Sequence, residues 1–100
     1  MNKTDELIDA VREWGRNKGI DNADKQTLKL LEESGELASE LCRGRYRSDE
    51  VKDALGDIEV VLIILADILG YDLMECLESA YDVIKDRKGH TVSGSFVKDI

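Results

Sequence analysis

Proline is absent from the sequence, so its helical patterns lack the residue that most often interrupts a helix. Cysteine occurs twice, at Cys42 and Cys76, within apolar helical patterns and without Cys-x-x-Cys spacing, and we interpret both as buried, reduced thiols. A single histidine, His90, excludes a di-iron carboxylate centre within one chain, because such bundles need a Glu-x-x-His pair on each of two helices. A metal site in this chain would therefore rely mainly on oxygen ligands.

Basic residues are also scarce, since 14 lysines and arginines stand against 22 acidic residues and give a net charge of -8. This balance lacks the positive footprint of a duplex-binding protein, so we expect no nucleic-acid partner. An acidic chain that handles phosphates would instead need a divalent metal as intermediary.

Long hydrophobic runs are missing as well. The longest apolar stretch, residues 58–69, is too short to span a bilayer and contains Glu59 and Asp67, so it predicts a core helix and no membrane association. The first ten residues lack the apolar segment of a signal peptide, and we expect a cytoplasmic protein.

The pattern that remains predicts one all-α domain over residues 1–100. Thr4 and Ser48 are expected to cap helices, and Gly44 and Gly70 to end them. Short connections between helices favour antiparallel neighbours and hence a four-helix bundle. The helices are predicted at about 4–14, 23–43, 48–69 and 73–88, followed by an irregular tail at 89–100.

The third predicted helix is apolar on nearly all of its faces after Asp57. A four-helix monomer cannot bury such a helix all round. We therefore expect a homodimer, or a dimer of dimers, with this helix near its centre.

Residues 32–36 crowd three carboxylates, Glu32, Glu33 and Glu36, beside a leucine stripe. Like charges three or four residues apart on a helix repel each other. A solvated helix face is the simple explanation, and it applies best to Glu32, which points furthest from the leucines. A bound cation would instead turn the repulsion into attraction.

Asp57 shares a helical stripe with Ala54, Val60 and Val61, so burying these residues should draw its carboxylate inward. A buried carboxylate must be neutralised, paired or bound to a metal. Asp53 lies one turn earlier on the same line.

Antiparallel packing of the second and third helices would set Glu33 and Glu36 opposite Asp53 and Asp57. Four carboxylates in one pocket suit Mg²⁺ or Mn²⁺, with phosphate oxygens of a substrate filling other positions.

Two stretches, "EESGEL" at 32–37 and "DALGDIEVVLIILADILG" at 53–70, resemble the MazG-like, all-α nucleoside triphosphate pyrophosphohydrolases. The ending "AYDVIKDRKGHTVSGSFVKD" at 80–99 looks like that of small phage-type and bacterial members. The resemblance implies cleavage of nucleoside triphosphates between the α and β phosphates. It also implies Mg²⁺, with Mn²⁺ as a substitute.

The resemblance carries the family's metal ligands onto Glu32, Glu33, Glu36 and Asp57. The glutamate expected three residues before Asp57 is Ala54 here, and Asp53 is the natural substitute because i-3 and i-4 share a helix face. Glu50, one turn before Asp53, is the alternative ligand. We predict that Glu33 or Glu36 is the general base.

Substrate contacts are expected from the basic run Lys85, Arg87 and Lys88, which could donate to phosphate oxygens. Asp82 stands where many relatives have asparagine, and it could contact the sugar or orient Lys85. Trp14 could stack on a base or belong to the core.

The departures at Ala54 and Asp82 leave an alternative function open, a non-catalytic helical module that binds metal or nucleotide as a regulator. A helical dimerisation domain without a site is the third interpretation. The sequence does not indicate the preferred base or sugar.

Overall fold

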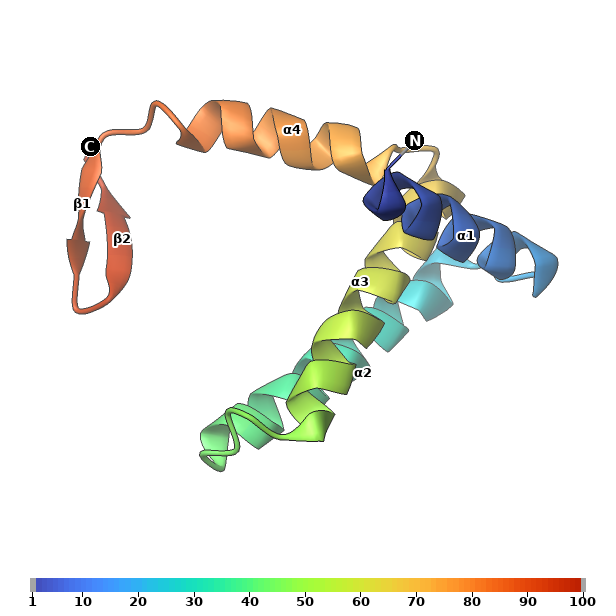
Figure 1. Cartoon of the computed structure of the whole chain (residues 1–100), viewed down its shortest axis with the longest axis horizontal. Helices are drawn as coiled ribbons and strands as arrows, with labels where there is room; N and C mark the ends of the chain where they lie inside the picture. The colour runs from blue at the N-terminus through green and yellow to red at the C-terminus, as the bar shows by residue number, and fades with distance from the viewer. Residues whose placement is uncertain (1, 100) are drawn as a thin grey trace.

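The computed structural model describes residues 2–99 of the chain and contains four helices and one two-stranded sheet in that range. The all-α prediction is confirmed for residues 2–84 (Figure 1). In chain order the elements are α1 (Lys3–Asn17), α2 (Ala23–Cys42), α3 (Asp49–Leu69), α4 (Leu73–Ile84), β1 (Gly89–Val92) and β2 (Ser95–Lys98).

Polar side chains start the helices, as the sequence predicts for α3. The Ser48 hydroxyl accepts a hydrogen bond from the backbone N–H of Val51 at 3.2 Å, and α3 ends at Gly70, whose φ of 81° suits glycine. The cap of α1 is Asn2 instead of the expected Thr4. Each cap satisfies N–H groups that the first turn of a helix leaves without an intrahelical partner.

Two helix ends differ from the prediction. α1 continues three residues beyond Trp14, to Asn17, because Gly15 keeps helical backbone and allows close packing against Ile64. α4 ends at Ile84 instead of residue 88, and the chain then turns toward the sheet.

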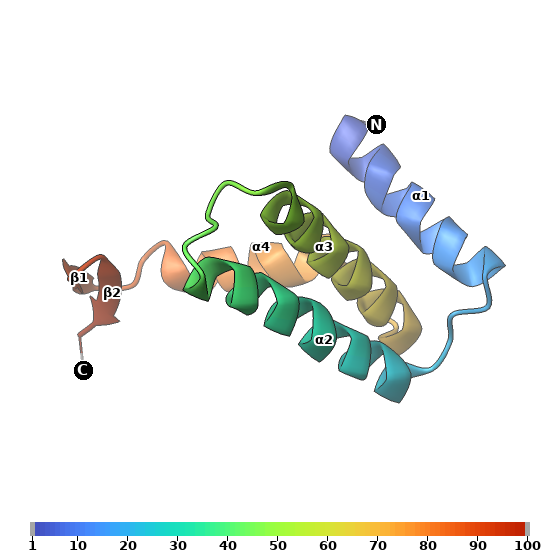
Figure 2. The same ribbon diagram turned by 90° about the horizontal axis from the view of Figure 1, so that it is seen from below.

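The helices α2 and α3 form an antiparallel pair joined by residues 43–48, and α1 packs across α3 (Figure 2). The start of α4 lies at the end of α3 and near α1, and the helix then extends away as an arm that carries the sheet (Figure 1). The core runs along α3, which packs against both α2 and α1. Its apolar side chains are Ile8, Val51, Ala54, Val61, Ile63 and Ile64.

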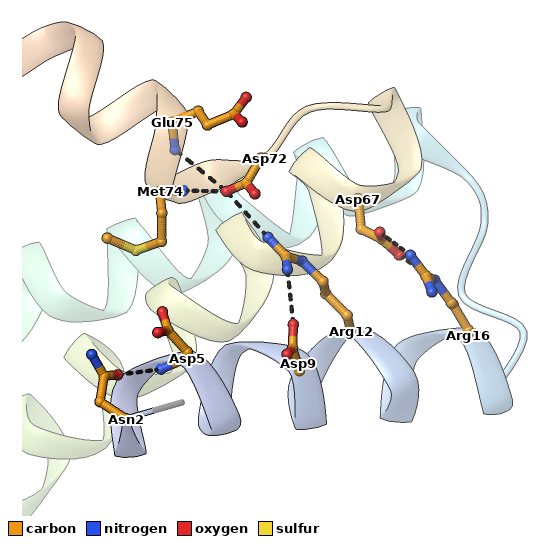
Figure 3. Close-up of polar contacts among 9 residues, drawn as sticks. All are labelled: Asn2, Asp5, Asp9, Arg12, Arg16, Asp67, Asp72, Met74 and Glu75. Atoms are coloured by element: carbon orange, nitrogen blue, oxygen red, sulfur yellow. Dashed lines mark hydrogen bonds and ion pairs between the residues drawn. The ribbon is translucent and has the colours of Figure 1, made fainter.

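Two arginines hold α1 against the corner between α3 and α4 (Figure 3). The Arg16 guanidinium makes a two-bond contact with Asp67, at 2.8 Å from Nε and 2.6 Å from Nη2. These hydrogen bonds, opposed by partial burial, lower the pKa of Asp67 and raise that of Arg16. Arg12 bridges Asp9 at 3.1 Å and Asp72, the cap of α4, at 3.4 Å.

The molecule is more extended than a chain of this length would be as a closed globule. Its radius of gyration is 16.1 Å, against about 13 Å for 100 compact residues. Its accessible surface is 7900 Å², against about 5,700 Å² for a monomer of this mass. Much apolar surface of α4 is therefore left uncovered within the single chain.

The prediction of an irregular tail is wrong, because β1 and β2 form an antiparallel hairpin with Val92 paired to Ser95. The two loop residues, Ser93 and Gly94, have φ of 49° and 81°. Positive φ at both positions is the geometry of the tight turns that match strand twist. The strands are exposed on both faces, so no burial alternation signals them in the sequence.

Both cysteines are free, as predicted, but they are exposed instead of buried. Cys42 is the last residue of α2, and Cys76 lies on the uncovered arm. Across residues 2–99, no helix combines the length and apolarity needed to cross a membrane.

Candidate active site

A groove of about 410 Å³ lies between the second half of α2 and the first half of α3. The antiparallel pairing brings these two acidic segments side by side. Three of the predicted metal ligands, Glu36, Asp53 and Asp57, therefore line one groove. Its other lining residues are Ser39, Glu40, Glu50 and Ala54.

A second cavity of about 450 Å³ adjoins this groove, since Asp57 lines both. It is bounded by the end of α1, the first half of α2 and the middle of α3. Acidic, basic and apolar side chains meet in it. They are Trp14, Ile20, Lys25, Gln26, Lys29, Glu33, Asp57, Val60, Val61 and Ile64.

Glu33 is the most unusual side chain of this site. It is only 6% exposed, and its Oε2 atom has no hydrogen-bond partner among the described residues. The other oxygen, Oε1, lies 3.4 Å from Lys29 Nζ, which is also 3.7 Å from Oε1 of Glu32. A buried carboxylate oxygen without a partner is costly, so this position favours a cation.

The charge of Glu33 acts on its neighbour. It raises the pKa of Glu36, with smaller contributions from partial burial, a hydrogen bond between the two carboxyl groups and the charge of Glu32. The pKa of Lys29 is raised by Glu32, Glu33 and Glu36. The repulsion predicted from the sequence is therefore present, and Lys29 offsets part of it.

Asp57 is exposed, which corrects the prediction of a buried carboxylate. Its neighbours on the stripe, Ala54 and Val61, are buried within the chain, but Asp57 lies at the edge of the groove where no helix covers it. Asp53 and Glu32 are also exposed.

Most of the candidate ligands line the groove and the adjoining cavity, but they are not arranged around a metal. Among residues 2–99, no three acidic, histidine or cysteine side chains converge in a way that could hold an ion. Exposed carboxylates change rotamer easily, whereas Glu33 is fixed by burial. The candidate ligands are all carboxylate oxygens, the donors that a hard divalent cation prefers, and one buried oxygen lacks a partner, so the chemistry of the residues present fits such a cation.

Ala54 occupies the position where the family resemblance leads us to expect a ligand, and it is 5% exposed in the floor of the groove. Glu40 is already engaged, with Oε1 at 3.4 Å from Arg45 Nη1 and Oε2 at 3.4 Å from the Ser48 hydroxyl. Asp53 is thus the carboxylate nearest in sequence to position 54, where the resemblance leads us to expect a glutamate.

The predicted phosphate-binding residues Lys85, Arg87 and Lys88 lie beyond the end of α4. Because α4 diverges from the α2–α3 pair after its first turns, the single chain does not bring them to the acidic groove (Figure 1). Lys85 Nζ lies 3.2 Å from Oδ1 of Asp82, in an ion pair between two exposed side chains three residues apart.

Trp14 is 50% exposed and lines the second cavity, so it is not a core residue. Three polar residues of the same cavity were not predicted from the sequence: Lys25, Gln26 and Lys29. A signal for Lys29 was available, because it stands three and four residues before Glu32 and Glu33.

Comparisons with known proteins agree with this architecture. No protein-family model matches the sequence. A solved structure, the cyanophage S-2L MazG-like pyrophosphohydrolase bound to dGDP and three catalytic Mn²⁺ ions per active site, aligns over 100% of both chains with a TM-score of 0.69 at 22% identity. The chain therefore has the MazG-like all-α fold.

A curated relative is similar over part of the chain. The uncharacterized 18.2 kDa protein in the rep-hol intergenic region of Haemophilus phage HP1 is 36% identical over 64 residues, which are 61% of this chain and 38% of that protein. The chain spans well under half of that relative.

Proposed function

We propose that this chain is a Mg²⁺-dependent nucleoside triphosphate pyrophosphohydrolase that forms a nucleoside monophosphate and pyrophosphate. The observation that carries the proposal is the buried, unpartnered oxygen of Glu33 beside a groove lined by Glu36, Asp53 and Asp57. Support also comes from the cyanophage protein of the same fold, which is described as a pyrophosphohydrolase with dGDP and Mn²⁺ bound. House-cleaning of the nucleotide pool in the cytoplasm is the role that we infer.

Glu33, Glu36, Asp53 and Asp57 would hold the metal, with Glu32 at the exposed edge, and Mn²⁺ would replace Mg²⁺. Bound divalent ions would neutralise the triphosphate and polarise its α-phosphorus. The chain itself would position a water and accept its proton. Glu33 or Glu36 would accept that proton, because both lie beside the groove in which the metal and its water would bind.

The second cavity would receive the nucleoside. The half-exposed indole of Trp14 offers a stacking face, and Val60 and Ile64 provide apolar walls. The Gln26 amide can both donate to and accept from a base edge. The two adjoining cavities would then hold the base in one and the phosphates in the other.

We further propose that a homodimer, or a dimer of dimers, completes the enzyme. The chain exposes about 2,200 Å² more surface than a compact monomer would, which is the scale of an obligate interface. An apolar groove of about 440 Å³ between α1, α3 and α4 is the surface that a second copy would cover. The arm of that copy would bring Lys85, Arg87 and Lys88 to a site that lacks them.

Oligomeric state is measured by light scattering coupled to size exclusion. Leu77→Asp places a charge in the apolar groove and should dissociate the assembly, whereas Glu78→Gln, one residue further and outside the groove lining, should not. Equal masses for both variants, or a monomeric parent, would remove this part of the proposal.

The catalytic proposal is tested by product analysis. The protein is incubated with Mg²⁺ and a panel of ribo-, deoxy- and modified nucleoside triphosphates, and the phosphorylated products are separated. Monophosphate plus pyrophosphate, lost in Glu36→Gln and Asp57→Asn, is the expected result. Orthophosphate as the first product would contradict it.

A second candidate is a regulator that binds metal or nucleotide without turnover. The buried Ala54 favours it, because an alanine stands where the resemblance leads us to expect a ligand. Metal-induced stabilisation without any product would support this candidate, and Ala54→Glu should then restore turnover.

A further inference from the structure

Lys29 forms ion pairs with two carboxylates of the acidic cluster, Glu32 and the buried Glu33. Its ammonium lies 3.4 Å from Oε1 of Glu33 and 3.7 Å from Oε1 of Glu32, four and three residues further along α2. The opposite oxygen of Glu33, Oε2, has no partner among the described residues. Lys29 is thus the cation nearest to the buried carboxylate in the metal-free chain.

A divalent ion bound at Glu33 and the Lys29 ammonium would both be attracted by the negative charge of the same carboxylate. Glu33 is fixed by burial, so a metal bound at Oε2 would share one carboxylate with the ammonium at Oε1 and lie close to it. Lys29 has a half-exposed, flexible side chain and can leave without disturbing α2. A cation that enters beside Glu33 therefore makes the ion pair redundant and repels the ammonium.

We propose that Lys29 is a stand-in cation, which neutralises Glu33 in the metal-free protein and competes with the divalent metal for it. The inference rests on the proposed function, because it requires a metal at Glu33. In the absence of metal, Lys29 holds the carboxylate of Glu33 by its ion pair and takes no part in the chemistry. Metal binding displaces Lys29 from its pair with Glu33.

Lys25 provides a matched control. It stands one turn earlier on the same face of α2 and lines the same cavity, yet it forms no ion pair among the described residues. Lys25→Gln changes the net charge as Lys29→Gln does and leaves the pair intact. Lys29→Arg keeps the charge next to Glu33.

The experiment measures Mn²⁺ affinity of the full-length chain without nucleotide, by titration calorimetry or by the free-Mn²⁺ resonance. Because exposed ion pairs are weak, Lys29→Gln should bind Mn²⁺ about two- to fivefold more tightly than Lys25→Gln. Lys29→Arg should stay near the parent. Without metal, Lys29→Gln should melt at a lower temperature than Lys25→Gln, because Glu33 then lacks any counter-cation.

Equal or weaker Mn²⁺ binding by Lys29→Gln relative to Lys25→Gln overturns the competition while leaving the metal site in place. A parent chain that binds no Mn²⁺ overturns the proposed metal site and this inference together. A merely structural lysine would loosen the site and weaken Mn²⁺ binding, so the direction of the change separates the two roles.

Discussion

Glu33→Gln removes the charge of the buried acid while it keeps the shape of the side chain. In the metal-free protein the glutamine amide can donate a hydrogen bond to Glu36, and the repulsion that raises the pKa of Glu36 disappears. An unpartnered buried polar group costs about 1–3 kcal/mol. If Glu33→Gln removes about 1 kcal/mol of this cost, its melting temperature should be roughly 4–8 °C above that of the parent in a domain of this size.

Metal reverses the order of stability. A metal at 100 times its dissociation constant stabilises the parent by about 2.7 kcal/mol, which corresponds to roughly 10–20 °C. Glu33→Gln should lose most of this increment, because its amide offers one neutral oxygen where the carboxylate offers charge. The variant should therefore melt above the parent in chelator and below it in Mg²⁺.

Thermal unfolding of both proteins in chelator, Mg²⁺ and Mn²⁺ measures these shifts, with Glu78→Gln on the exposed arm as control. The reasoning is refuted if Glu33→Gln keeps the full metal increment. It is equally refuted if the metal-free variant melts several degrees below the parent, since Glu33 would then be stabilising without a metal.

Three further predictions concern acidity, packing and the hairpin. Between the ordinary glutamate pKa of 4.5 and the raised pKa of Glu36, the folded metal-free protein binds more protons than the unfolded chain. The free energy of unfolding should therefore rise as pH falls through that window. Glu36→Gln should flatten this part of a profile of Tm against pH. Gly15→Val should lower the free energy of unfolding, measured by chemical denaturation, by about 1–3 kcal/mol, because even a Cβ would lie 3.1 Å from Ile64. In the control Gly35→Ala the new Cβ meets nothing within 4 Å, so the free energy of unfolding should rise by about 0.5–1 kcal/mol. Gly94→Ala forces an L side chain to φ of 81° and should weaken cross-strand NOEs in the hairpin by a population shift of about 1–2 kcal/mol; unchanged NOEs would contradict the turn assignment.

The helices could be predicted because their signals are local. Ser48 caps α3 through a hydrogen bond three residues away, and Gly70 ends it with a positive φ. The sequence predicts an end of α1 at Trp14, because Gly15 follows it. The tolerance of Gly15 inside the helix depends on its contact with Ile64, 49 positions further along, which periodicity alone does not contain.

The candidate site could be predicted in part for the same reason. Pairing of α2 with α3 follows from their short connection, and it brings Glu36, Asp53 and Asp57 to one groove. Which carboxylate is buried depends on what covers each face. The sequence pattern favoured Asp57, whereas in the single chain Glu33 is buried and Asp57 lies at an open edge.

The pairing of the hairpin strands and the position of the basic run at 85–88 could not be predicted from local sequence patterns. Pairing of four exposed residues per strand leaves no hydrophobic pattern, and only the Ser93–Gly94 turn signalled it. The position of Lys85 depends on the direction of α4, which the Arg12–Asp72 ion pair and the contact with α3 set at the far end of the helix.

Hydrolysis in ¹⁸O-labelled water tests the central claim most directly, because it identifies the phosphorus that is attacked. The reaction is run with Mg²⁺ and the best triphosphate, and the products are weighed by mass spectrometry, with Glu36→Gln as the inactive control. The account predicts one ¹⁸O atom in the nucleoside monophosphate and none in pyrophosphate. Label in pyrophosphate or orthophosphate, or turnover that survives in Glu36→Gln, would contradict it.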